Sequence, residues 1–385
     1  MRFPSPIRSL ALKAWPYHQV LLAGLWVLAQ LLFWRKFHGP HFVNDSARYL
    51  AYAHGIAERS YFEPGHNLRY VLYPLFQSLW LRLGLGWPGI VVGQLLISAL
   101  ATRAIYRSTR RLADGGRGAA ALATLAFIAW PDIQQFNVFL LTESLFISLT
   151  ALSFGAFTKL VFGRPRDWAL LLLVLTLTAL VRPNGFVVAL AAALAGLDAL
   201  RRRPDRRLWY AALLGLALLA PLLWAVLNHQ LATFYLMDTY QRGELIFRSP
   251  LWAVHQTAPL AMPPPGTGPA ARVLYFAGHN PVYLGRLMLG KLFVFVSYLK
   301  PHYSLAHRVL GVLVLWPAYW LAARGVRRPG IWRPARVFLA GAFLLQTAIV
   351  MLTVDDWDVR FLAPVLPVVF ILATLELNNR VALPD

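Results

Sequence analysis

The feature that most constrains this chain is a series of apolar runs, each close to the length of a helix that crosses a bilayer. A bilayer core of about 30 Å requires about 20 apolar residues in an α-helix. The chain is 58% hydrophobic and 14% charged, whereas about a quarter of the residues in soluble domains are charged. The runs lie at about 17–34, 88–106, 118–131, 137–162, 168–181, 186–200, 208–228, 306–323, 337–354 and 361–378. We therefore predict an all-α polytopic membrane protein, a single domain over 1–385 with about ten transmembrane helices.

Basic residues gather in the segments between these runs. They are concentrated in 1–16, 103–117, 164–166, 201–207, 324–336 and at Arg380. Such bursts mark the cytoplasmic side of a membrane protein, so the net charge of +21 reflects topology and indicates no nucleic-acid partner. Placing every burst inside requires an even number of crossings, which ten helices satisfy. We predict an integral protein of a bacterial inner (plasma) membrane, in contact with membrane lipids.

The stretch 168–200 has two interpretations. Its first part, 168–181, has 14 residues and spans about 21 Å as a helix, so one tilted helix over the whole stretch is an alternative. That helix would place one flanking basic burst outside, against the charge rule. We therefore predict a hairpin that turns at Arg182-Pro183-Asn184-Gly185, at or slightly below the outer surface.

Two long segments, 35–87 and 229–305, then fall outside the membrane. In the first, an Asn44-Asp45-Ser46 cap signal predicts one amphipathic helix, and the run from Arg69 to Leu83 predicts a second. Both helices are expected to lie in the interface plane. The second segment contains the proline-rich run 262–269, which cannot continue a helix. We interpret the second segment as a possible lid.

Asp45 is the first candidate for catalysis. It begins the predicted helix of the first outer segment, and at helical spacing it shares a face with Arg48, Tyr49 and Tyr52. Aspartate is also a favoured residue at helix N-termini, so a capping role alone would explain it. We predict a catalytic or substrate-binding role for Asp45 and an acceptor-binding role for the three neighbours.

Glu143 and Arg182 lie at membrane depth, where ionisable groups are costly and face a cavity or a partner. Glu143 is therefore either a catalytic group or half of a structural ion pair, with Arg182 as the partner. Pro183 constrains the backbone beside Arg182. The planar guanidinium of Arg182 suits phosphate. The alternative for Arg182 is a side chain that extends to the interface without a ligand.

Further charged residues border the outer side. Positive charge there opposes the topology rule, so we expect Arg69, Lys300 and His302 to contact phosphate, either in catalysis or as lipid headgroup ligands. Lys291 and Arg308 belong to the same rim.

The last outer turn, Asp355-Asp356-Trp357-Asp358-Val359-Arg360, brings acids and one arginine together. Its spacing matches no known metal loop, so we predict no metal or other cofactor, with a divalent cation at the acids as the alternative. Asp358 and Arg360 are the better site candidates because they are closest to the membrane. The absence of cysteine excludes a thiolate metal site and a cysteine nucleophile.

Several short motifs, in order between about residues 40 and 375, resemble those of the membrane-embedded GT-C glycosyltransferases. They are Asn44-Asp45-Ser46 with Tyr49, Tyr70 to Tyr73-Pro74-Leu75, Leu141-Thr142-Glu143-Ser144-Leu145-Phe146, Val181-Arg182-Pro183-Asn184-Gly185 and Asp358-Val359-Arg360-Phe361. That class includes protein O-mannosyltransferases and the aminoarabinose transferases that act on lipid A. Many relatives carry two adjacent acids where this chain has Asn44-Asp45.

The resemblance implies a GT-C fold and a polyprenyl-phosphate sugar as donor. It places a carboxylate of the first outer loop, here Asp45, as the base or as the group that orients the acceptor. We therefore predict that a sugar moves, with inversion, to an acceptor hydroxyl at the outer, periplasmic face. Glu143 is the second catalytic candidate; Arg182, Arg69, Arg360, His302 and Lys300 would bind the donor phosphate, and Arg48, Tyr49, Tyr52, Tyr73 and Asp358 the acceptor or sugar.

Two alternatives remain at this stage. A transporter or flippase for a lipid-linked glycan would carry charges within several helices and internal repeat symmetry, and neither is evident here. An O-antigen ligase or polymerase shares the donor type, and the segment 229–305 partly fits the large late loop of such proteins. The acceptor, whether lipid, glycan or protein, is not indicated by the sequence.

Overall fold

The computed structural model describes residues 15–160, 165–232, 234–256, 258–353 and 358–381, and within them the protein is all-helical. Only isolated β-bridges join extended residues in these ranges. The helices are α2 (His18–Lys36), α3 (Asn44–Arg59), α4 (Leu72–Arg82), α5 (Gly86–Leu112), α6 (Arg117–Ala129), α7 (Pro131–Gln134), α8 (Glu143–Lys159), α9 (Pro165–Val181), α10 (Phe186–Arg201), α11 (Arg207–Leu231), α12 (Leu236–Arg242), α13 (Pro269–His279), α14 (Pro281–Ser297), α15 (Leu305–Leu310), α16 (Trp316–Arg327), α17 (Arg333–Leu352) and α18 (Leu366–Val381).

Each of the ten apolar runs contains a helix within the described residues, but the number of crossings is not thereby confirmed. Within the described residues, five helices are long and apolar enough to span a membrane: Gly86–Leu112, Pro183–Arg201, Arg207–Leu231, Leu305–Arg327 and Arg333–Leu352. Two further apolar helices, Arg117–Ala129 and Ala363–Asn378, are shorter. The apolar helices support insertion into a membrane, and ten transmembrane helices stay a prediction.

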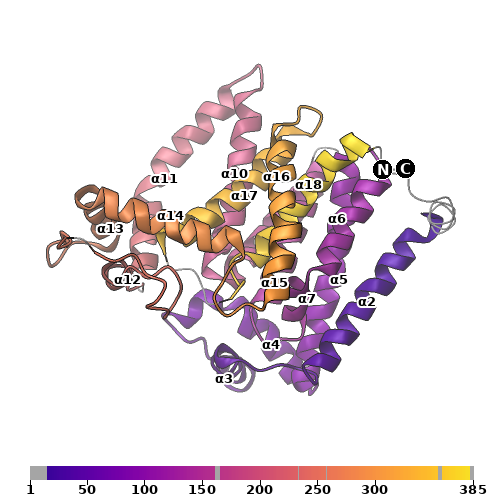
Figure 1. Ribbon diagram of the computed structural model, residues 1–385, viewed down its shortest axis with the longest axis horizontal. Coiled ribbons are helices and arrows are strands. Elements are labelled where there is room, and N and C mark those ends of the chain that lie inside the picture. Colours follow the sequence, from indigo (N-terminus) through magenta and orange to yellow (C-terminus); the bar gives the residue numbers. More distant parts are fainter. Residues whose placement is uncertain (1–14, 161–164, 233, 257, 354–357, 382–385) are drawn as a thin grey trace.

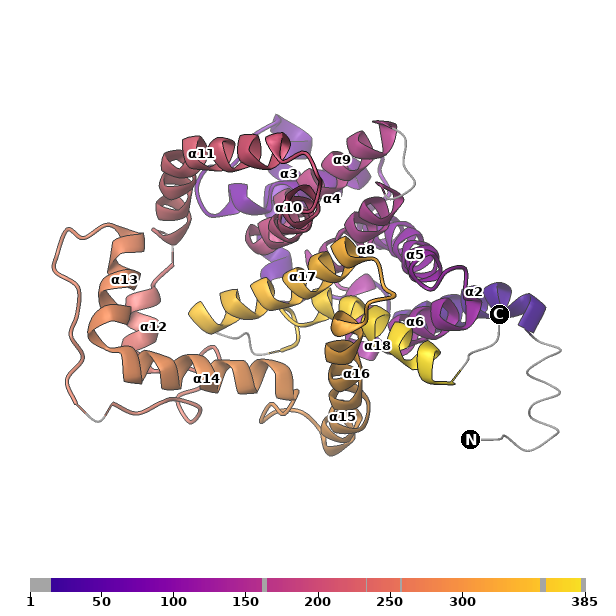
Figure 2. The same cartoon turned by 90° about the horizontal axis from the view of Figure 1, so that it is seen from above.

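The core lies around α8 and α18, which are covered on nearly all sides. Almost every residue of α8 is buried, and α18 packs against α6, α16 and α17. In Figure 2 these two helices lie in the middle of the molecule, and α11 and α13 lie at its periphery. Helix α11 has no buried residue at all. A helix that is apolar all round and uncovered by protein fits a lipid environment.

The chain reverses between α9 and α10, as the hairpin prediction requires. Arg182 is in an extended conformation that ends α9, and a Cβ on Gly185 would lie 1.9 Å from the carbonyl oxygen of Thr178. In one continuous helix, residues seven positions apart are about 10.5 Å apart along the axis. The close approach therefore excludes the single tilted helix, and the hairpin is confirmed.

This contact predicts that Gly185→Ala destabilises the protein, because an added methyl group would overlap the Thr178 backbone. Forced overpacking of this kind costs about 1–3 kcal/mol. The matched control is Gly196→Ala in α10, where an added Cβ meets nothing within 4 Å, so alanine is expected to be neutral or stabilising there. Thermal unfolding in detergent compares the two variants. Equal unfolding temperatures would contradict the tight turn.

The two helices predicted in the first outer segment are present. Helix α3 begins at Asn44, where the Ser46 hydroxyl accepts a hydrogen bond from the Val43 amide (3.0 Å). Helix α4 packs against α3. The residue flanking the helix is thus Val43, one position before the predicted cap signal. Asp45 is left in the first turn with its carboxylate available for other partners.

The second outer segment is largely ordered by α12, α13 and α14. Helix α14 packs along α17, and the two sides of the proline-rich run are held because Asn280 exchanges two hydrogen bonds with the backbone of Ala261 (2.9 and 3.0 Å). The run itself is not helical over 262–268. The lid role of 229–305 stays a prediction.

Basic and outer segments lie at opposite ends of the molecule. Figure 1 shows the loops that follow α10 and α16, which carry basic bursts, at the upper end, and α3, α4, α7 and α15 at the lower end. Which of the two ends faces the outside of the cell stays a prediction. The lower end carries the candidate site.

Candidate functional site

Four charged groups from distant parts of the chain meet at the lower end. Arg182 donates a hydrogen bond to the Glu143 carboxylate (2.7 Å), and Arg360 contacts the same carboxylate oxygen through its Nε. A terminal nitrogen of Arg360 then donates to Asp45 (2.9 Å). Asp45 and Arg360 are 315 positions apart in sequence. The structure thus joins both candidate acids and two of the candidate arginines in one row.

Glu143 forms the buried end of this row. Its side chain is fully buried, it is the first residue of α8, and its second carboxylate oxygen accepts from the Thr142 hydroxyl (3.2 Å). A carboxylate at a helix N-terminus is also favoured by the helix dipole. The sequence left two roles open for Glu143, a catalytic group or half of a structural ion pair, and this contact with Arg182 is that ion pair. With two guanidinium groups bound, Glu143 is placed to position arginines rather than to take a proton.

Arg182 is held firmly at the hairpin turn. Its side chain is 5% exposed, and its guanidinium lies over the rings of Phe146 and Phe361, at 5.7 and 5.3 Å. Stacking and the ion pair with Glu143 together define its orientation. The side chain therefore does not extend to the surface as the alternative for Arg182 supposed.

Asp45 forms the accessible end. Its side chain is 37% exposed, and besides Arg360 it faces Arg48 at 3.6 Å. Arg48 in turn donates to the Tyr49 hydroxyl (3.3 Å) and lies over the rings of Tyr49 and Tyr70. The row therefore alternates in sign, from buried Arg182 through Glu143, Arg360 and Asp45 to partly exposed Arg48. Asp45 is the acid that a molecule from solvent can reach.

The turn that carries Arg360 is fixed from two sides. The Asp358 carboxylate accepts from the Arg360 amide (2.9 Å), and the buried Lys300 ammonium donates to the Asp358 carbonyl oxygen. Asp358 and Lys300 thus support the position of Arg360. Asp355 and Asp356, the acids considered for a divalent cation, lie outside the described residues.

Three further predicted site residues, Arg69, Tyr73 and Tyr52, contact partners outside this row. Arg69 donates to the carbonyl oxygens of His229 and Gln230 at the end of α11 (both 3.3 Å). Tyr73 is fully buried and donates to Gln94 (2.8 Å), so its hydroxyl is not open to an acceptor. Tyr52 is buried near Glu63 and Tyr61 instead of beside Asp45. These pairings give Arg69, Tyr52 and Tyr73 structural contacts.

His302 does not supply a steady positive charge. Burial, followed by the nearby Lys300 and His307, lowers the pKa of His302 below its usual 6.5. At pH 7 the ring is therefore mostly neutral. A role for His302 as a cationic phosphate ligand would require a bound anion to raise that pKa.

No protein-family model, curated protein or solved structure matches the chain.

The structure also joins polar residues that the sequence did not bring together. The Nε2 atom of His307 lies 3.0 Å from the Asp132 carboxylate, which accepts, and 2.8 Å from the Tyr298 hydroxyl, and Tyr303 stacks on the ring. The two partners are 175 positions apart in the sequence, so no local pattern indicates this contact. This contact links α7 to α15 and to the end of α14.

No group of three or more metal-ligating side chains occurs among the described residues. The carboxylates of the site are each paired with arginine. We therefore expect that adding EDTA leaves turnover within about twofold. If EDTA abolished activity and Mg²⁺ or Mn²⁺ restored it, the result would instead favour a divalent cation bound by the acids Asp355 and Asp356.

Proposed function

We propose that the protein is a membrane glycosyltransferase that moves a sugar from a polyprenyl-phosphate donor to an acceptor hydroxyl at the outer face of the membrane. One observation carries the proposal: a partly exposed carboxylate, Asp45, lies 2.9 Å from a guanidinium, Arg360, at one end of an apolar helical protein. The motifs that resemble GT-C enzymes include both residues. Transfer from a lipid phosphate needs a base for the acceptor and a cation for the leaving group, and this pair supplies one of each.

In the proposed reaction Asp45 accepts the proton of the acceptor hydroxyl while the acceptor oxygen bonds to the anomeric carbon. The bond between that carbon and the phosphate oxygen breaks, and its electron pair leaves with the phosphate. Attack opposite the leaving phosphate inverts the anomeric centre. Arg360, with its side chain 18% exposed, stabilises the negative charge that develops on the phosphate.

Glu143 and Arg182 act through Arg360 in this scheme. Glu143 binds Arg360 from the buried side, and Arg182 holds Glu143 in turn. Because a guanidinium already bound on one edge has fewer rotamers available, Arg360 is preorganised for phosphate. We therefore assign positioning roles to Glu143 and Arg182 and keep the catalytic role for Asp45.

The proposal is tested with purified protein in detergent. The donors are polyprenyl-phosphate mannose, glucose and aminoarabinose, the acceptor is a lipid extract of the envelope, and the measurement is release of free polyprenyl phosphate. We expect release with one donor class together with a new glycolipid in the mass spectrum. The same glycolipid should be missing from cells that lack the gene.

The assay also separates the alternatives. A flippase moves its lipid between leaflets without breaking a glycosidic bond, so it would release no polyprenyl phosphate in detergent. Release of a lipid diphosphate in place of the monophosphate would favour a ligase or polymerase. No release from any donor, with correctly folded protein, would overturn the proposal.

A further inference from the structure

A cavity of about 870 Å³ lies far from the row of paired charges, between α2, α5 and α6. Helix α2 is attached to α5 at two levels. Near its start, His18 and Gln19 contact the Tyr106 hydroxyl (2.7 and 3.2 Å), and near its end Gln30 is joined through Asn137 to Ser98. The cavity begins between these levels and extends past Tyr106 along α5, as far as Asp114 and Gly115 beyond its end.

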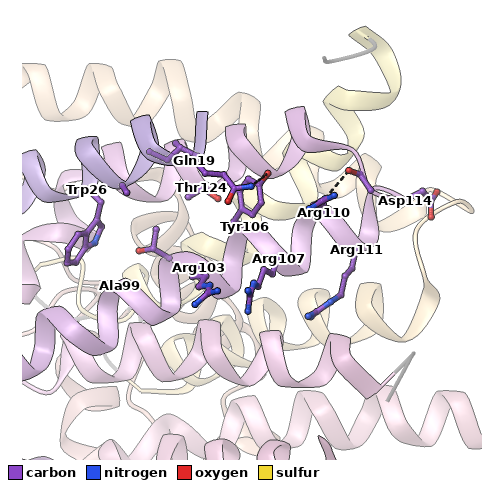
Figure 3. Close-up of a pocket in the computed structure, with 14 residues that line it drawn as sticks. Gln19, Trp26, Ala99, Arg103, Tyr106, Arg107, Arg110, Arg111, Asp114 and Thr124 are labelled. Atoms are coloured by element: carbon purple, nitrogen blue, oxygen red, sulfur yellow. Dashed lines mark hydrogen bonds between the residues drawn. The ribbon is translucent and has the colours of Figure 1, made fainter. Parts of the chain in front are cut away.

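One wall of the cavity is strongly cationic. Arg103, Arg107, Arg110 and Arg111 line it from α5, at a spacing that puts them along adjoining faces of the helix. Figure 3 shows Arg103, Arg107 and Arg111 projecting in a row from one helix. Among the lining residues Asp114 is the one acid.

Among the described residues, no acid forms an ion pair with any of these four arginines. Arg111 donates to Thr158 (3.2 Å) and Arg110 to the Gly115 carbonyl oxygen (3.3 Å). Within the described part of the chain, Arg103 and Arg107 form no hydrogen bond or ion pair. Like charges one helical turn apart destabilise a helix, so an anion bound between them would relieve repulsion as well as form ion pairs.

The other wall is apolar. Leu22, Ala23 and Trp26 of α2 face Ala99 of α5 across the cavity, and the small alanines leave the space open. Helix α5 has 27 residues, which is about 40 Å against a bilayer core of about 30 Å. Its arginine-bearing C-terminal end therefore reaches the headgroup level while the alanine and leucine part stays at acyl-chain depth.

We propose that this cavity binds an anionic glycerophospholipid of the inner leaflet, with its phosphate at Arg103, Arg107 and Arg110 and an acyl chain between α2 and α5. A free phosphate would use only the cationic wall and leave the apolar one empty. The basic segment 1–16 contains no acid, so it does not complement the arginines. Basic pockets between membrane helices on the cytoplasmic side suit lipids of this charge.

The test is native mass spectrometry of the full chain titrated with phosphatidylglycerol or phosphatidylcholine. We expect preferential binding of phosphatidylglycerol. The triple substitution Arg103→Ala, Arg107→Ala, Arg110→Ala should weaken it about 100-fold. The matched control Arg201→Ala, Arg202→Ala, Arg203→Ala removes the same charge from exposed residues outside the cavity and should change binding less than about twofold.

A second pair of variants tests the apolar wall with all arginines present. Ala23→Trp fills the cavity and should weaken phosphatidylglycerol binding. Pyrophosphate, a free anion that would use only the cationic wall, should bind unchanged. Leu25→Trp, at an exposed neighbouring position outside the cavity, should leave both unchanged. Equal losses in the two triple variants, equal binding of both lipids, or full lipid binding by Ala23→Trp would each overturn the proposal.

Discussion

Replacing Asp45 with asparagine is expected to lower sugar transfer by about 10²- to 10⁴-fold, the usual contribution of a positioned general base. Asparagine keeps the shape of the side chain and a carbonyl oxygen for Arg360, but it cannot accept the acceptor proton. Binding of the donor should change little because Arg360 keeps its contact with Glu143. The measurement is polyprenyl phosphate release at saturating donor.

A matched control lies on the same helix. Glu58 of α3 is exposed and pairs with His54 (3.1 Å), so Glu58→Gln removes one acid without touching the row. We expect wild-type turnover for Glu58→Gln. If Asp45→Asn also retained wild-type turnover, Asp45 would have no part in the chemistry.

The second large effect concerns stability. Glu143→Gln leaves Arg182 and Arg360, with side chains 5% and 18% exposed, without their shared counter-charge. Breaking a buried ion pair by removing one partner costs about 3–5 kcal/mol. We expect a marked drop in the unfolding temperature, together with loss of activity because Arg360 loses its support. Thermal unfolding and transfer assays on the same preparation measure both effects.

Glu244→Gln is the control for this prediction. Glu244 is also mostly buried, but its partner Arg242 is 55% exposed, and pairs with such exposed partners contribute about 0–1 kcal/mol. The expected order is therefore a small effect at Glu244 and a large one at Glu143. Similar unfolding temperatures for the two variants would show that the Glu143 pairs contribute little to the fold.

Much of the helical layout could be predicted because apolar runs report burial in protein or lipid directly. The ends of the helices were less predictable where tertiary contacts replace helical hydrogen bonds. The run 137–162 was expected to be one helix, yet α8 starts at Glu143. The reason is that Gln94 donates to the carbonyl oxygens of Asn137 and Phe139 (both 3.0 Å), and His41 exchanges backbone hydrogen bonds with this stretch.

The convergence of the outer charges was predictable from topology, whereas their pairing was not. Charge bias between loops put Asp45, Glu143, Arg182 and Arg360 on one side. That Arg360 joins both acids depends on how the last turn packs over α8, and no local pattern reports this. Tyr73 was misjudged for a related reason: its buried partner Gln94 lies on α5, so an aromatic residue that resembled a site residue belongs to the core.

The alternating row has a consequence for the charge count of the proposed reaction. Arg182, Glu143, Arg360, Asp45 and Arg48 together carry one excess positive charge, which equals the single negative charge of a sugar phosphodiester. When the phosphodiester becomes a monoester it gains up to one further negative charge, while Asp45 loses its own by taking the proton. Substrate and product states are then both close to electroneutral, so no counter-ion has to enter a low-dielectric site during turnover.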